Sequence, residues 1–122
     1  MGTEFGDALR DRRRESGISQ RKLADLAEVD FSYISKLENG RLPAPAAETI
    51  VRFAKVLGCP PEELLAPAQK MPDEVGSRLS SEPTALRFLQ EASDLKLSPE
   101  EWEKLRGSLR NLRSDPRRGR KS

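Results

Sequence analysis

The segment that most constrains this chain is Gly17–Gly40, GISQRKLADLAEVDFSYISKLENG, which predicts two short helices joined by a tight turn. Ser19 is a good N-cap for the first helix, because its hydroxyl can accept hydrogen bonds from the free amides of the opening turn. Asp30 is placed to cap the second helix, and Gly40 to end it in a left-handed conformation. Glu28 lies in the turn between them. Two helices with so short a connection cross steeply, and the second is left projecting.

Helical spacing places apolar residues on the inner faces of this pair. These residues are Leu23, Ala24, Leu26 and Ala27 in the first helix, and Ile34 and Leu37 in the second. The N-terminal half of the second helix is thereby left exposed, which is the geometry that fits the major groove of DNA. An ordinary buried helical hairpin is the alternative, but a hairpin does not require Gln20 or the Glu-Asn-Gly sequence at its end.

Three motifs in this segment resemble the Cro/cI (XRE-type) helix-turn-helix domain of phage and bacterial repressors. They are Ser19-Gln20, the Leu-Ala-x-x-Ala of residues 23–27, and the Tyr-Ile-Ser-x-Leu-Glu-Asn-Gly of residues 33–40. The resemblance runs from about Phe5 to Leu65 and departs at Glu28, where the family usually has glycine. A left-handed conformation there costs a non-glycine residue about 1 kcal/mol, so we expect a slightly altered turn.

Composition limits the class of protein. A chain of 122 residues holds one domain, or one small domain with an appendage, and 35% hydrophobic residues predict a modest core. The sequence has no run of about 18 apolar residues and no apolar stretch near its start, so we expect neither a membrane span nor a secretory signal. One cysteine excludes an internal disulfide framework and fits a reducing cytoplasm, where we expect the protein to be.

Enzymatic chemistry finds little support in the sequence. The chain has no histidine, which removes the commonest general base and metal ligand, and its one cysteine cannot build a zinc site. The glycine-rich phosphate-binding motifs are absent. Adjacent carboxylates at Glu62-Glu63 and Glu100-Glu101 fall at predicted helix N-termini, where negative charge is favourable. We therefore expect no catalytic activity, no cofactor and no metal.

The net charge of +2 is small for a protein that binds nucleic acid. Residues 1–66 carry ten basic and eleven acidic side chains, and residues 67–122 carry twelve and nine. Non-specific DNA binding should be feeble, because that contribution counts the phosphates neutralised. Local clusters must then supply the contacts, and a solvated surface is the alternative role for them. The clusters are Arg10, Arg12, Arg13 and Arg14 in the first helix, and Arg21 and Lys22 in the second.

The predicted fold is all-α. A five-helix repressor-type helix-turn-helix domain spans residues 1–66, and a linker spans residues 67–72. A three-helix dimerisation or regulatory segment follows at residues 73–113, and a disordered basic tail at residues 114–122. Proline at N1 is expected to start helices at Pro61 and Pro83, and Ser98-Pro99-Glu100-Glu101 is a strong start signal for the last helix.

The last two predicted helices carry apolar stripes that about 35 residues cannot bury alone. The stripes must pack against the N-terminal unit or against another chain, and we favour a homodimer interface. Its predicted residues are Leu86, Leu89, Trp102, Leu105, Leu109 and Leu112.

The resemblance also implies which side chains meet DNA. The implied base contacts have suitable chemistry: Ser32 can donate or accept at a base edge, Lys36 can donate to guanine, and Phe31 can pack on a thymine methyl. Helix packing is the alternative role for Phe31. The implied phosphate contacts are Gln20, Arg13, Arg21, Tyr33, Ser35, Asn39 and Arg41. Arg13 has a second implied role, because a family arginine at this place pairs with the glutamate of Leu-Glu-Asn-Gly, here Glu38.

These observations favour a sequence-specific, dimeric transcriptional repressor that reads a palindromic operator in double-stranded DNA. The C-terminal half is similar to repressors of the DdrO/ImmR type, which a partner zinc metallopeptidase removes. That similarity implies a cleavage site between Leu105 and Arg106. One alternative is the antitoxin of a toxin–antitoxin pair, which binds a toxin and autoregulates its operon. Another is a scaffold that uses the helix-turn-helix only for packing.

Overall fold

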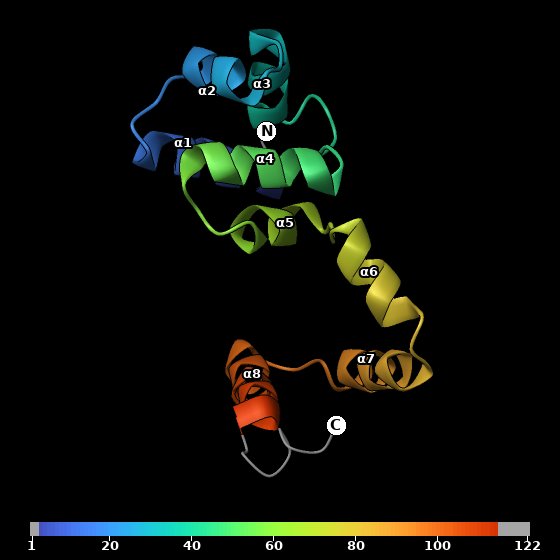
Figure 1. Cartoon of the computed structure of the whole chain (residues 1–122). Coiled ribbons are helices and arrows are strands. Elements are labelled where there is room, and N and C mark those ends of the chain that lie inside the picture. Colours follow the sequence, from blue (N-terminus) through green and yellow to red (C-terminus); the bar gives the residue numbers. More distant parts are fainter. Residues whose placement is uncertain (1–2, 115–122) are drawn as a thin grey trace. The chain divides into compact units, whose positions relative to one another are not determined.

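The computed structural model describes residues 3–114, and the regular structure in this range is entirely α-helical. The predicted all-α fold class is confirmed. The helices, shown in Figure 1, are α1 (Glu4–Glu15), α2 (Gln20–Ala27), α3 (Phe31–Glu38), α4 (Ala47–Leu57), α5 (Glu62–Ala68), α6 (Asp73–Ser80), α7 (Pro83–Leu95) and α8 (Pro99–Ser114).

The chain divides into two compact units, Met1–Ser77 and Arg78–Ser122, so the division falls inside α6. The segment expected to be a linker differs from its prediction at one end, because α5 continues to Ala68 and includes Pro67. The expected basic tail, residues 114–122, lies outside the described residues except for Ser114, the last residue of α8.

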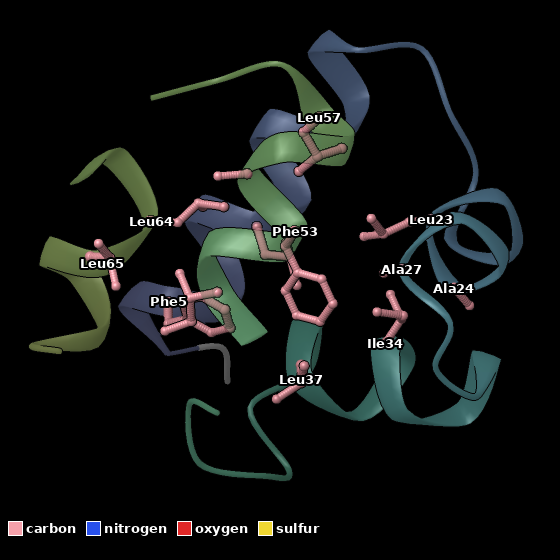
Figure 2. Close-up of a cluster of buried hydrophobic side chains, with 13 residues drawn as sticks. Phe5, Leu23, Ala24, Ala27, Ile34, Leu37, Phe53, Leu57, Leu64 and Leu65 are labelled. Carbon is pink, nitrogen blue, oxygen red and sulfur yellow. The ribbon is translucent and has the colours of Figure 1, made fainter. Parts of the chain in front are cut away.

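The core of the first unit is built by apolar side chains from all of α1 to α5. Phe53 of α4 lies in the middle of the cluster in Figure 2, with Leu23 and Ile34 to one side and Leu64 to the other. These four side chains are fully buried. Because α2 and α3 both contribute to this core, packing fixes the helix-turn-helix pair onto the rest of the unit.

The turn between α2 and α3 contains the main departure from the family pattern. Glu28 has φ 59° and ψ 46°, which is the left-handed conformation that a glycine would adopt without strain. The expected alteration of the turn is therefore wrong: the glutamate accepts the left-handed geometry, at a cost of about 1 kcal/mol.

The two predicted caps of this pair differ in their outcome. Ser19 is confirmed as a side-chain cap, since its Oγ accepts a hydrogen bond from the Lys22 amide at 3.0 Å. Asp30 occupies the N-cap position with extended backbone, but its carboxylate makes no capping hydrogen bond. The first turn of α3 is instead closed by the backbone, with the Tyr33 amide donating to the Asp30 carbonyl at 3.1 Å.

Leu26 does not lie on the inner face of α2 as predicted, because its side chain is 50% exposed. Leu23, Ala24 and Ala27 are buried, and they occupy about a quarter of the helix circumference. Leu26 falls to the side of that arc, away from the core, so the inner face is narrower than the apolar pattern indicates.

Helix α1 crosses the C-terminal end of α3 at Gly6, a buried residue near the start of α1. A Cβ atom on Gly6 would lie 2.5 Å from the Leu37 carbonyl oxygen and 3.1 Å from the Glu38 carbonyl oxygen. Both oxygens belong to backbone, which cannot swing aside as a side chain would. The absence of a side chain at Gly6 therefore sets how closely α1 and α3 approach.

We expect Gly6→Ala to lower the free energy of unfolding by about 1–3 kcal/mol, because overpacking against backbone outweighs the helix propensity gained by alanine. The matched control is Gly76→Ala in α6, where the nearest atom to a new Cβ is the Met71 sulfur at 3.8 Å. That control should be neutral or stabilising by up to about 1 kcal/mol. Urea unfolding of the three proteins, followed by circular dichroism, measures the difference. Equal stability of wild type and Gly6→Ala would mean that α1 and α3 are not in close contact there.

Candidate nucleic-acid interface

Helix α3 has one face in the core and one face in solvent. Ile34, Leu37 and Glu38 are buried, whereas Ser32 and Lys36 are exposed one helical turn apart. Phe31, the first residue of the helix, is 39% exposed. The three side chains expected to read bases are thus accessible on a helix that the core holds in place.

Phe31 is covered on one side by an arginine from the neighbouring helix. The guanidinium carbon of Arg21, in the first turn of α2, lies 4.3 Å from the centroid of the Phe31 ring. This is a cation–π contact, in which a positive group is attracted to the electron-rich face of an aromatic ring. The contact joins the N-terminal ends of α2 and α3.

The last residue of α3, Glu38, is fully buried and is surrounded by hydrogen-bond donors. Arg13 of α1 binds both carboxylate oxygens, with Nε 2.7 Å from Oε2 and Nη2 3.0 Å from Oε1. Gln20 of α2 donates from Nε2 to Oε1 at 2.9 Å. Arg10 donates to the Glu38 backbone carbonyl and places its Nε 3.8 Å from Oε1. One buried carboxylate therefore joins α1, α2 and α3.

The pairing of Arg13 with Glu38 is confirmed. Arg13 also donates from Nη1 to the Ile18 carbonyl at 3.0 Å, and its side chain is only 11% exposed. Hydrogen bonding to Glu38 raises the pKa of Arg13, opposed by desolvation, so the guanidinium remains charged. Arg13 takes the second of its two expected roles, because its donors are used inside the protein, and we leave it out of the phosphate contacts.

The other residues expected to contact phosphate differ in their exposure and in the hydrogen bonds they already make. Arg21 and Arg41 are exposed, whereas Gln20 is half-buried and its amide nitrogen already binds Glu38. Tyr33 packs partly against the core, and burial raises the pKa of its phenol. The remaining two are joined to each other, since the Asn39 amide nitrogen lies 3.5 Å from Ser35 Oγ on the solvent side of α3.

Most arginines of the α1 cluster make contacts within the protein, whereas, Arg13 apart, we expected phosphate contacts or a solvated surface. Besides the bonds of Arg10 and Arg13, Arg12 lies 3.5 Å from Glu63 of α5. Arg10 and Arg13 are three residues apart and so share a helix face, which is the signal that could have identified Arg10 as a partner of Glu38. Arg52 was not predicted at all; it donates to the Ala27 carbonyl at 3.0 Å, at the C-terminal end of α2.

A family model described as a helix-turn-helix domain matches residues 4–66, the range that holds α1 to α5. The chain belongs to the helix-turn-helix family. The HTH-type transcriptional repressor RghR of Bacillus subtilis is 34% identical over 107 residues, covering 83% of this chain and 78% of RghR. The uncharacterized HTH-type transcriptional regulator RghRB of the same organism is 38% identical over 74 residues, covering 58% of this chain and 53% of RghRB.

Among solved structures, the restriction-modification controller protein C.AhdI from Aeromonas hydrophila is 35% identical to this chain. The comparison covers 51% of this chain and 92% of that one, with a TM-score of 0.48. The predicted helix-turn-helix identity of the N-terminal unit is confirmed by the family match. The resemblance of the C-terminal half to peptidase-controlled repressors stays a prediction.

This helix-turn-helix protein is a DNA-binding regulator and not an enzyme, as its family match and relatives indicate. Its cysteine, Cys59, is half-buried against the core, and burial raises the pKa of the thiol, which disfavours the thiolate form. Within residues 3–114, no helix combines the length and the apolar character that crossing a membrane requires.

The second unit contains an apolar groove of about 520 Å³. Phe88 and Leu89 of α7 line it together with Trp102, Leu105 and Leu109 of α8, and Leu109 is 64% exposed. The capping box that starts α8 is confirmed, since the Glu101 amide donates to Ser98 Oγ at 3.2 Å and the Ser98 amide donates to Glu101 Oε1 at 2.9 Å. The helix that carries the predicted stripe is thus well defined, and its apolar face is open.

The Glu38 cluster should dominate the stability of the first unit among its charged groups. We expect Glu38→Ala to lower the free energy of unfolding by roughly 3 kcal/mol or more, because it leaves the guanidinium of Arg13 buried without its partner. Arg21→Ala, which removes an exposed charge and one cation–π contact, should cost less than about 1 kcal/mol. Thermal and urea unfolding of both variants measure the contrast. Similar losses in the two variants would show that the Arg13–Glu38 pair does not hold the helices together.

Proposed function

We propose that this protein is a dimeric transcriptional repressor that reads a two-fold symmetric operator through α3 in the major groove. The observation that carries the proposal is the exposed face of α3, where Phe31, Ser32 and Lys36 project from a helix fixed by the core and by Glu38. Family membership and the similarity to RghR, which is named a transcriptional repressor, support it.

Base contacts are proposed for this exposed face. The ammonium of Lys36 suits the O6 and N7 acceptors of guanine, the hydroxyl of Ser32 suits either a donor or an acceptor, and the ring of Phe31 suits a thymine methyl. Phosphate contacts are proposed for the side chains around it. They are Arg21, Tyr33, Ser35, Asn39, Arg41 and Gln20, whose amide nitrogen has a second N–H besides the one that binds Glu38.

Two copies are needed for tight binding, because the first unit is nearly neutral, with ten basic and eleven acidic side chains in residues 1–66. Much of the positive charge of α1 is spent on Glu38 and Glu63 and is not available to phosphates. Affinity for DNA rises with the number of phosphates neutralised, so a single unit should bind weakly. Two units on one face of the duplex double that number and read two half-sites.

We assign the apolar groove of the second unit to a second copy of this chain. Trp102, Leu105, Leu109 and Leu112 are spaced 3, 4 and 3, which is the spacing of a seam between paired helices. Glu101 flanks this seam on one side and Arg106, which pairs with Glu103 on its own helix, flanks it on the other. A parallel, two-fold related copy would bring these opposite charges near each other across the seam. A self-complementary surface of this kind is what a symmetric dimer requires.

Cleavage between Leu105 and Arg106 is not part of the proposal. Both residues lie in the middle of α8, and Leu105 lines the groove. A peptidase binds its substrate in extended form, so this helix would have to unwind before the bond could be cut. In the antitoxin alternative, the same groove would hold a toxin instead of a second copy of this chain.

Base reading is tested by changing Lys36. We expect Lys36→Ala to weaken binding to a selected operator by about 1–3 kcal/mol and to relax the preference at one base pair in each half-site. Arg41→Ala is the control, because loss of a phosphate contact should weaken binding to all sequences alike. The slope of log affinity against log salt concentration should fall by about the amount expected for one phosphate contact. Selection of bound DNA from a random library, with wild type and both variants, measures this. An unchanged base preference in Lys36→Ala would exclude α3 as the reading helix.

Dimerisation is tested by placing a charge in the groove. We expect Leu109→Glu to be monomeric, with the first unit still folded and operator binding at least tenfold weaker, because a carboxylate cannot be buried in an apolar seam without large cost. Arg110→Glu changes the charge of the adjacent exposed residue and should remain dimeric. Truncation after Arg106, which removes Leu109 and Leu112, should behave like Leu109→Glu. Analytical ultracentrifugation at equal protein concentration gives the oligomeric state.

A dimeric Leu109→Glu variant with normal operator binding would contradict this interface. A wild type that is monomeric at micromolar concentration would instead favour a foreign partner in the groove, as the antitoxin alternative requires.

A further inference from the structure

The contact between Arg21 and Phe31 has no role in the core. Phe31 is 39% exposed and does not belong to the buried cluster, and Arg21 is exposed on α2. The guanidinium carbon of Arg21 nevertheless lies over the ring, 4.3 Å from its centroid. The two side chains come from different helices and meet where α2 and α3 begin, on the side where α3 is accessible.

The contact with Arg21 favours one position of the Phe31 ring, since an exposed cation–π contact is worth about a two- to fivefold preference. An exposed phenylalanine at the first residue of a helix can occupy several rotamers, and burying it against DNA would require one of them to be selected. A guanidinium over one ring face favours a single orientation and leaves the opposite face and the edge free for a partner. The ring is therefore preorganised before DNA arrives, which reduces the entropy lost on binding.

Arg21 can hold the ring and bind a phosphate at the same time. A guanidinium uses its flat face for stacking, whereas its N–H donors point outward in the plane and remain available. Among the described residues, no ion pair occupies these donors at the distances found for Arg10, Arg12 and Arg13. A lysine ammonium has no such flat face, so it could neutralise a phosphate but would not position the ring equally well.

We propose that Arg21 is a positioning residue for base recognition, which acts by holding the Phe31 ring against the methyl group of a thymine in each half-site. The inference rests on the proposed function, since it assigns a specificity role within the same surface. It adds to Arg21 a role that a phosphate contact alone does not have: control over which base is preferred.

The test replaces thymines in the selected operator by deoxyuridine, one position of each half-site at a time, which removes only the 5-methyl group. Binding of full-length protein is measured by fluorescence anisotropy at several salt concentrations. For wild type we expect one position at which the substitution weakens binding about fourfold per half-site, the value of one buried methyl or methylene group. Phe31→Ala should bind equally to thymine and deoxyuridine at that position.

The decisive variants are those of Arg21. We expect Arg21→Ala to lose most of the preference for the methyl group, with less than about a twofold difference remaining for each half-site. Arg21→Lys should retain the salt dependence of wild type while losing much of that preference, because charge is kept and stacking is weakened. Lys22→Ala, which removes the adjacent exposed cation but leaves the contact with Phe31, should keep the full preference.

Two results would overturn the inference while leaving the proposed function intact. One is an Arg21→Ala protein that keeps the full thymine preference and loses only salt dependence, since Arg21 would then be a phosphate contact alone. The other is a wild type that binds its operator tightly but is insensitive to deoxyuridine at every position. Failure of wild type to select any DNA would instead overturn the proposed function.

Discussion

The buried carboxylate of Glu38 is the interaction on which the arrangement of the first unit depends. A charge with no solvent exposure must be paired and hydrogen-bonded, and here the donors come from Arg13 on α1 and Gln20 on α2. The carboxylate belongs to the last residue of α3, so its hydrogen bonds to Arg13 and Gln20 hold that end of α3 against α1 and α2. Compared with an apolar replacement, a buried pair of this kind adds little net stability. We infer that its main effect is to select one orientation of α3.

This anchoring explains how a nearly neutral unit can present a defined reading surface. The arginines of α1 that the sequence offers as phosphate contacts largely bind partners within the protein. They fix the geometry of the unit, and its non-specific affinity for DNA is correspondingly lower. Gly6 completes the arrangement, because its missing side chain lets α1 approach the backbone at the end of α3. What remains exposed on α3 is a small set of chemically different side chains, which suits discrimination between bases better than strong attraction to any DNA.

The two units supply different parts of the proposed activity. The first unit offers the surface that distinguishes sequences, and the second offers an apolar groove and a 3-4-3 seam that a second copy can cover. Since the first unit is nearly neutral, we attribute affinity to the joining of two reading surfaces on one duplex. Any event that occupies or opens the groove would then alter operator binding without a change in the reading helix itself.

The sequence by itself determined the elements and the family. Apolar periodicity, the Ser19 cap, the Ser98–Glu101 capping box and the Leu-Glu-Asn-Gly end are local signals, and the helices they predict are present within residues 3–114. The Arg13–Glu38 pair could also be predicted, although only through the resemblance to a known domain. Local signals suffice here because helix starts and ends depend on hydrogen bonds between residues three or four positions apart.

Only the tertiary structure decided which polar and apolar groups face each other across elements. It turned Arg10 inward to Glu38, a role that had not been assigned to it, and it left Leu26 half exposed, although helical spacing placed that residue on the inner face. It also brought Arg21 over Phe31 from another helix, a contact that no spacing in the sequence indicates. The physical reason is that a helix circumference offers several faces to the core, and only packing against specific neighbours determines how wide the buried face is and which charges it meets.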